Sequence, residues 1–294
     1  MRISVNLTNY SWPSGPSGLP GELSKVVRRA DEGGIDTIWV SDHLIQADPT
    51  AKPDQTEMLE AYTTLGFLAA NTRRARIGAM VSAVFFRAPA LLVKAVTTLD
   101  VLTGGRAWLG IGAGYHGEEA EAIGLPLPPA ADRFEQLEEG LQIAIKMWSG
   151  DDSPFEGKHY RLRRPVGSPL PAHRPHPPIL IGGAGEQKTL RLVAQYADAC
   201  NLFDIPDGGK TVRHKLEVLA RHCEEVGRPY DAIEKTLSTR LEPNETSDSF
   251  ARRCEAAAAL GIEHMVVIRP GPWTEEALTT LTKAIPMVEQ VAAR

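Results

Sequence analysis

The sequence has few cysteines and lacks a long hydrophobic run. Three of the 294 residues are cysteines (Cys200, Cys223 and Cys254), and no two of them form a CxxC pair. This argues against a disulfide scaffold and suits a reducing cytosol. The longest apolar run, residues 77–86, is too short to span a bilayer. Residues 1–12 lack the pattern of a signal peptide, so we expect a soluble, cytoplasmic protein.

Positive charge is not in excess either. The chain has 32 basic and 37 acidic residues, and its net charge is −5. Such a balance argues against a nucleic acid or an anionic membrane as the partner. No linker-like stretch divides the chain, and its length fits one α/β barrel with an insertion. We therefore expect a single domain over residues 1–294.

One pattern recurs along the chain: an amphipathic stretch, a glycine and then a short apolar run. In its first occurrence, Leu23, Val26 and Ala30 share one helical face, Gly33 ends the helix and an apolar strand follows. Eight apolar runs are candidate strands: 2–7, 36–41, 75–81, 106–112, 177–183, 198–203, 234–241 and 264–269. The helical patterns after them begin near Leu23, Glu57, Pro89, Asp132, Glu186, Thr211, Ser247 and Thr274. Eight strand–helix pairs predict a (β/α)8 TIM barrel, with an open doubly wound sheet as the alternative.

An insertion over residues 151–177 separates the fourth and fifth predicted strands. It is rich in proline, glycine and arginine, and within it residues 155–162 predict a small hairpin. We expect the rest of the insertion to be a loop that crosses the carboxyl end of the barrel. Just before it, Asp132 and Glu135 have the spacing of a capping box at the start of a helix.

In barrel enzymes the functional residues follow the carboxyl ends of the strands. Asp42 and His43 directly follow the second predicted strand. Histidine can transfer a proton near neutral pH, and a carboxylate can bind a ring N–H of a cofactor. The alternative is an aspartate that caps a helix and a half-buried histidine that binds the backbone.

The turn at residues 182–185 predicts an anion site. Gly182, Gly183 and Gly185 separate the fifth predicted strand from the next helix. Glycines let backbone N–H groups approach an anion, and a helix N-terminus adds positive potential. A tight turn alone would explain one or two of these glycines. The segment matches neither a Walker loop nor GxGxxG, and phosphate binding is our interpretation.

The fourth predicted strand carries glycine at alternating positions. Gly110, Gly112 and Gly114 share one face of the strand, which would let a flat ring lie close. The alternative is an interior position in the barrel that requires small residues. Tyr115 and His116 follow at the rim. The next two residues, Glu118 and Glu119, could begin a solvated helix, and we favour this interpretation for Glu119.

The remaining histidines and cysteines give no support for a metal site. His173 and His176 lie in a proline-rich loop without a nearby carboxylate in the sequence. Cys223 and Cys254 fall on apolar helical stripes and are expected in the core. We therefore predict no metal.

Several segments together resemble the luciferase-like monooxygenase superfamily, in particular its branch that uses the deazaflavin coenzyme F420. The resemblance rests on residues 35–44, 75–119, 132–151, 155–162 and 177–198. It implies a (β/α)8 barrel that holds a flavin or deazaflavin at its carboxyl end. FMN is the alternative cofactor. Members are often dimers, so a homodimer is expected.

The resemblance also implies roles for individual residues. Asp42 would contact the cofactor ring, and His43 would donate or accept a proton. A bulge with a non-proline cis peptide would support the ring at about residues 80–82. The cofactor contacts implied in this way are Asp42, Met80, Val81, Ser82, Ala113, Gly114, Gly182, Gly183, Ala184 and Gly185.

One position departs from the pattern of the F420-dependent sugar-phosphate dehydrogenases. Those enzymes carry a glutamate directly after the glycine that matches Gly114, whereas this chain has Tyr115. The residue that handles the proton therefore stays open among His43, Tyr115 and His116. The expected function is hydride transfer between F420 and a small or medium organic substrate. The alternatives are an FMN-dependent monooxygenase and a non-catalytic flavin or deazaflavin carrier.

Overall fold

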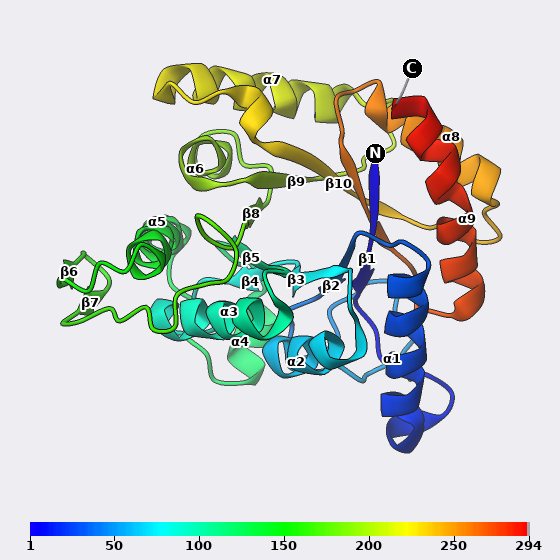
Figure 1. Ribbon diagram of the computed structural model, residues 1–294, viewed down its shortest axis with the longest axis horizontal. Helices are drawn as coiled ribbons and strands as arrows, with labels where there is room; N and C mark the ends of the chain where they lie inside the picture. The colour runs from blue at the N-terminus through cyan, green and yellow to red at the C-terminus, as the bar shows by residue number, and fades with distance from the viewer. Residues whose placement is uncertain (293–294) are drawn as a thin grey trace.

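The computed structural model describes residues 1–292 (Figure 1). Eight strands form a closed, all-parallel ring, in which β3 also pairs with β5. In ring order they are β1 (Arg2–Leu7), β2 (Thr37–Val40), β3 (Arg76–Ala79), β5 (Ala107–Gly112), β8 (Ile179–Gly182), β9 (Ala199–Phe203), β10 (Glu234–Arg240) and β11 (His264–Ile268). This confirms the predicted TIM barrel, because in an open sheet β3 and β5 would not pair with each other.

Helices surround the ring, and one extra short helix follows β5 (Figure 1). They are α1 (Gly15–Glu32), α2 (Ala61–Asn71), α3 (Pro89–Thr103), α4 (Gly117–Ala122), α5 (Ala130–Trp148), α6 (Thr189–Tyr196), α7 (Lys210–Val226), α8 (Ser247–Ala258) and α9 (Glu275–Ala292), with a 3-10 turn, η1, at Tyr230–Ala232. Within residues 1–292, no helix combines the length and apolar character that crossing a membrane requires.

Four helix starts differ from the sequence prediction by two residues or more. Helix α2 begins at Ala61, four residues after Glu57, because the Glu60 side chain caps it by accepting the backbone N–H of Thr63. Helix α1 begins eight residues before Leu23, with Pro16 in its first turn, a position where proline's fixed φ suits the helix. Helix α5 begins at Ala130, which places Asp132 in the first turn and not at the cap. Helix α6 begins three residues after Glu186, because the intervening residues form a turn.

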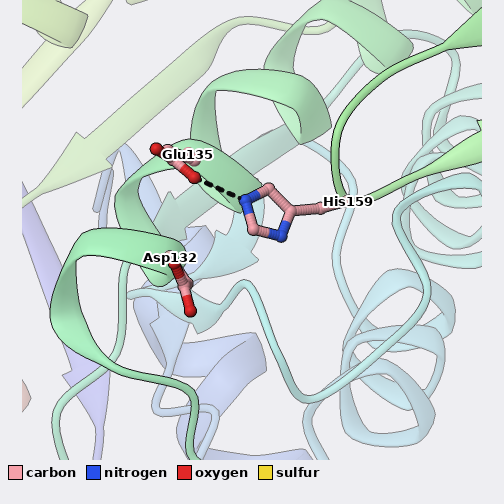
Figure 2. Close-up of side chains that lie close together, drawn as sticks. All are labelled: Asp132, Glu135 and His159. Atoms are coloured by element: carbon pink, nitrogen blue, oxygen red, sulfur yellow. Dashed lines mark hydrogen bonds and ion pairs between the residues drawn. The ribbon is translucent and has the colours of Figure 1, made fainter.

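The insertion contains the predicted hairpin, in which β6 (Phe155–Glu156) pairs antiparallel with β7 (Arg161–Leu162). Figure 2 shows how it is joined to α5: His159 Nε2 lies 2.7 Å from Glu135, close to Asp132. Lys158 Nζ binds the same Glu135 oxygen at 2.6 Å. Hydrogen bonds from Lys158 and His159 lower the pKa of Glu135 to about 2. Because Lys158 already balances this carboxylate, we assign the cluster to anchoring the hairpin.

The insertion does not cross the carboxyl end of the barrel, so that expectation was wrong. His173 N donates to Asp100 on α3 at 2.9 Å, and its ring lies 3.3 Å from the carbonyl oxygen of Gly105, just before β5. These contacts are at the amino end of the barrel. The physical reason is the direction of α5, which runs antiparallel to the strands. The insertion leaves α5 and enters β8 at the same, amino end.

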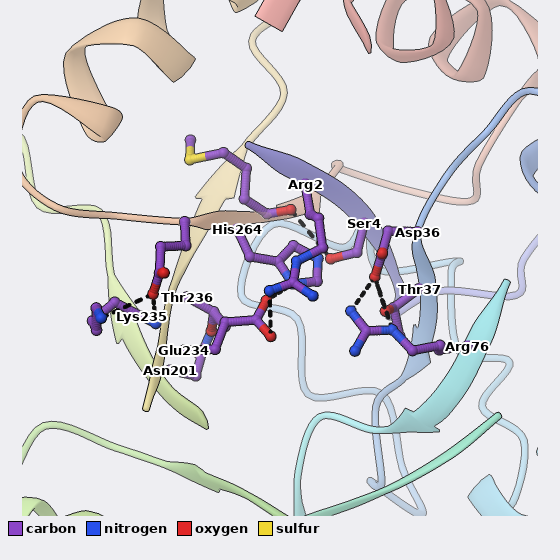
Figure 3. A network of polar contacts seen from close by, with 12 residues as sticks. Arg2, Ser4, Asp36, Thr37, Arg76, Asn201, Glu234, Lys235, Thr236 and His264 are labelled. Atoms are coloured by element: carbon purple, nitrogen blue, oxygen red, sulfur yellow. Dashed lines mark hydrogen bonds and ion pairs between the residues drawn. The ribbon is translucent and has the colours of Figure 1, made fainter. Parts of the chain in front are cut away.

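The amino end of the barrel is closed by a polar network (Figure 3). Glu234 lies between the fully buried His264, whose Nδ1 is 2.7 Å away, and Arg2, at 2.9 Å. Burial raises the pKa of Glu234, but the hydrogen bond from His264 and the charge of Arg2 outweigh it, so the pKa lies below its usual value. Asp36 and Arg76 form a neighbouring pair. Because these charged side chains bind one another, we assign them to stabilising the amino end of the barrel.

The backbone leaves regular β structure after β3. The Met80–Val81 peptide is cis, which confirms the bulge that the resemblance implied, and the chain then pairs again with β5 as β4 (Ser82–Ala83). The bulge explains the alternating glycines. A Cβ added at Gly110 would lie 1.9 Å from the carbonyl oxygen of Ala79, and one at Gly182 would lie 2.8 Å from Val81. Gly110 is therefore required for packing, as the alternative interpretation of this strand proposed.

We predict that Gly110→Ala lowers the free energy of unfolding by at least ~1–3 kcal/mol, because its methyl group overlaps the bulge backbone. Gly21→Ala is the matched control. Gly21 lies inside α1 with nothing within 4 Å of an added Cβ, so this change should stabilise the protein by roughly 0.5–1 kcal/mol. Urea unfolding measures both, and equal stability of Gly110→Ala and the wild type would contradict the packing described here.

Candidate functional site

A cavity of about 650 Å³ opens at the carboxyl end of the barrel. The loops after most of the strands contribute to its wall, as expected for a TIM barrel. The predicted site residues that line it are Asp42, His43, Met80, Val81, Ala113, Gly114, Tyr115, His116, Gly182, Gly183, Ala184 and Gly185. The structure therefore brings together residues from four widely separated parts of the sequence.

Ser82 is the predicted site residue that the structure does not bring to the cavity. Its side chain is fully buried, and its hydroxyl lies 3.1 Å from the hydroxyl of Tyr62. Neighbouring residues of a strand point to opposite faces, so Val81 and Ala83 face the cavity while Ser82 packs toward α2. The Ser82 side chain therefore lies outside the cavity wall, where the sequence predicted a cofactor contact.

His43 is held by a buried carboxylate. Its Nδ1 lies 2.7 Å from Oε2 of Glu119, a side chain with 0% exposure. The other oxygen of Glu119 accepts hydrogen bonds from the backbone N–H groups of Leu44 and Ile45. Because a carboxylate only accepts, Nδ1 of His43 carries the donated proton, and Nε2 is the ring nitrogen left for a ligand.

Glu119 corrects the sequence prediction, which placed it on a solvated helix start. Helix α4 packs against the loop after β2, and its helical phase turns Glu119 inward while Glu118 stays exposed. Two adjacent glutamates give no signal that separates the buried one from the exposed one. Only the fold shows that residues 43–45 and 119 meet.

Asp42 also has a partner that the sequence did not reveal. Arg87 binds both of its oxygens, at 2.6 and 3.0 Å, and binds Glu60 as well. The Asp42 side chain is fully buried. Burial lowers the pKa of Arg87, but its hydrogen bonds to Asp42 and Glu60 outweigh this and raise it. Arg87 therefore fixes the orientation of Asp42 at the wall of the cavity.

Three rings form the wall beside α4. The ring centroid of His43 lies 6.3 Å from that of Tyr115 and 5.7 Å from that of His116. His116 caps α4, since its Nδ1 accepts the backbone N–H of Glu119 at 3.1 Å. Tyr115 is 73% exposed at the rim. Of the three candidates for proton transfer, His43 is the one whose orientation is fixed by a buried charge.

The glycine turn after β8, the neighbour of β5, forms another part of the wall. Gly183 has a φ of +113°, which L side chains rarely adopt, and the backbone N–H groups of Ala184 and Gly185 have no acceptor within residues 1–292. A Cβ at Gly185 would lie 2.9 Å from the hydroxyl of Thr189, the first residue of α6. Free amides, a bare backbone and a hydroxyl beside a helix start suit a phosphate group.

The chain belongs to the luciferase-like monooxygenase family, whose model matches residues 1–284. Within this family, an F420-dependent glucose-6-phosphate dehydrogenase of Kineococcus radiotolerans is 31% identical over 235 residues. The match covers 77% of this chain and 65% of that enzyme, so this chain spans slightly less than two thirds of the relative's length.

Two solved structures share the fold at low sequence identity. An F420-dependent secondary alcohol dehydrogenase in complex with an F420–acetone adduct superposes with a TM-score of 0.82, at 16% identity and 98% coverage of both chains. The F420-dependent tetrahydromethanopterin reductase of Methanopyrus kandleri gives a TM-score of 0.80 at 15% identity, covering 98% of this chain and 99% of that one. Both likenesses confirm the fold, a parallel (β/α)8 barrel.

We predict that Glu119→Gln lowers the free energy of unfolding by about 1–3 kcal/mol, because the amide cannot accept all the hydrogen bonds that the carboxylate accepts. Glu118→Gln is the matched control on the neighbouring, exposed position, and it should change stability by less than about 0.5 kcal/mol. Chemical denaturation compares the two variants. If they were equally stable, Glu119 would not hold the loop after β2.

Proposed function

We propose that the protein is an oxidoreductase that transfers a hydride between coenzyme F420 and a small or medium organic substrate. The observation that carries this proposal is the cavity, which places the Val81 bulge and His43 beside a turn of free backbone amides. The F420-dependent relative supports the same cofactor. An FMN-dependent monooxygenase and a non-catalytic carrier are the alternatives.

The residues of the cavity fit a cofactor with a flat ring and a phosphate. Gly112, Ala113 and Gly114 carry little or no side chain of their own, and the side chain of Val81 lies against Gly112 in the wall of the cavity. In this proposal Val81 supports one face of the ring, and Ala184 and Gly185 donate their amides to the phosphate. Asp42, oriented by Arg87, contacts the edge of the ring.

When bound, the deazaflavin supplies the hydride chemistry, and the protein supplies position and a proton. Glu119 holds Nδ1 of His43, so that Nε2 can give a proton to the substrate or take one from it. The apolar wall excludes water from the reacting groups. Tyr115 and His116 complete the wall beside His43, and we assign them to shaping the site.

We expect the protein to bind F420 more tightly than FMN, measured by quenching of the fluorescence of each compound. Gly183→Ala should raise the Kd for F420 at least ~10-fold, because the methyl group strains a backbone with φ +113° at the phosphate site. Gly124→Ala is the control: its φ is +71°, nothing lies within 4 Å of an added Cβ, and it is outside the cavity wall. Tighter binding of FMN, or an unchanged Kd in Gly183→Ala, would contradict the proposal.

His43→Ala separates an enzyme from a carrier when F420 affinity and turnover of an identified substrate are both measured. The enzyme should keep F420 binding and lose turnover, because His43 acts on the substrate. A variant that turns over at the wild-type rate would remove His43 from the mechanism.

We propose a homodimer that pairs through α2 and α3. Helix α2 carries no charged side chain, and the neighbouring α3 exposes Leu91 and, at 77%, Leu102. Large apolar side chains that are exposed on neighbouring helices are typical of a protein–protein interface. Sparse, fully buried thiols support our placement of the protein in the cytoplasm.

Sedimentation velocity should show a dimer that Leu102→Glu dissociates, because a charge in an apolar interface is costly. Val226→Glu places the same charge at an exposed apolar residue of α7 and should leave the dimer intact. A monomeric wild type, or a dimer that survives Leu102→Glu, would contradict this interface.

A further inference from the structure

We propose that the substrate is an uncharged, mainly apolar molecule with a hydroxyl or carbonyl group, and not a phosphorylated or carboxylated one. This rests on the proposed function, since it concerns the space beside the cofactor in the same cavity. It differs from the phosphorylated sugar in the name of the Kineococcus relative.

The charges around the cavity disfavour an anionic substrate. Arg240 is the only lysine or arginine among the described residues that line it, whereas Asp42, Asp48 and Glu119 are acidic. The anion site at Gly182–Gly185 follows β8, and Asp48 lies in the loop after β2. In the ring, β3 and β5 lie between these two strands. Under the proposed function that site holds the cofactor phosphate, which leaves the far wall for the substrate.

Arg240 is already engaged. It donates to Asp48 at 3.2 Å and to the hydroxyl of Thr50 at 3.1 Å, across the opening from β10 to the loop after β2. The Asp48 side chain is 3% exposed. Burial raises the pKa of Asp48, but hydrogen bonds from Thr50 and the charge of Arg240 outweigh it and lower the pKa. A phosphate that captured Arg240 would leave this buried carboxylate without its cation, which is costly.

The rest of the wall suits an apolar body with neutral polar groups. Large apolar side chains approach from separate segments: Met58, Phe85, Phe86, Phe134, Phe203 and Ile268. The neutral amide side chains of Asn6 and Gln46 also line the cavity. An amide group can both donate and accept hydrogen bonds, and it carries no charge. Together they match a hydroxyl or carbonyl group on an otherwise apolar ligand.

Binding to matched compounds tests this inference directly. We would titrate 2-phenylethanol and 2-phenylethyl phosphate, then glucose and glucose 6-phosphate, into the protein with and without F420, using ligand-observed NMR. With F420 bound, so that its phosphate fills the anion site, the phenyl alcohol should bind at least ~10-fold more tightly than its phosphate, and glucose 6-phosphate should not bind more tightly than glucose. In that state, a phosphate that binds as tightly as its parent alcohol, or a phenyl alcohol that does not bind, would overturn the inference.

The two proposals can fail separately. If the protein preferred the phenyl alcohol but did not bind F420, the proposed cofactor would be wrong and the substrate class would stand. If F420 bound and glucose 6-phosphate bound more tightly than glucose, the substrate class alone would be wrong.

A charge placed in the wall should reverse the preference. Phe203, the last residue of β9, lines the cavity and is 56% exposed, whereas Ile205, two residues further along the chain, is 44% exposed but outside the wall. Phe203→Arg should tighten binding of 2-phenylethyl phosphate at least ~10-fold, and Ile205→Arg should not change it. An equal gain in both variants would overturn the inference, because overall charge would then set the preference. Ile268→Lys replaces Phe203→Arg if that variant does not fold.

Discussion

The buried carboxylate of Glu119 holds the mouth of the barrel together. It joins α4, which follows β5, to the loop after β2, two strands away in the ring. Its hydrogen bonds satisfy two backbone N–H groups and one ring nitrogen where water is excluded, so each is strong and its loss costly. The position of His43, and with it the chemistry of the cavity, depends on this one side chain.

A second constraint acts at β3, which lies between β2 and β5 in the ring. The bulge after β3 turns Val81 inward, and it fits because β5 and β8 carry glycine where any side chain would collide. The glycine turn after β8 then leaves its amides free at the cavity wall. The glycine turn therefore offers neutral backbone donors that suit a cofactor phosphate. The loop after β2 offers the fixed imidazole of His43, which suits a group that acts on a substrate.

Much of this arrangement could be predicted from the sequence. The repeated alternation of apolar runs and helical stripes predicts the barrel, and the rule that strand ends carry the site identifies Asp42, His43 and the glycine turn. The bulge at Met80 and Val81 followed from the resemblance. These features depend on local pattern, which the sequence carries directly.

The parts that were missed depend on contacts between distant segments. Arg87 and Arg240 look like ordinary surface charges until the fold places each against a buried carboxylate. Glu119 is buried and Glu118 is exposed only because the two side chains point in different directions from the short helix α4. The insertion begins at the end of α5, and α5 runs antiparallel to the strands. The insertion therefore starts at the amino end of the barrel, and the predicted loop across the carboxyl end did not take this direction into account.

The tautomer of His43 tests the central claim most directly. Nitrogen-15 NMR of the histidine rings, at a pH where the imidazole carries one proton, distinguishes the two nitrogens. If Glu119 holds the ring, the proton is on Nδ1, and Nε2 is the unprotonated nitrogen facing the cavity. A proton on Nε2, with Nδ1 unprotonated, would contradict the account.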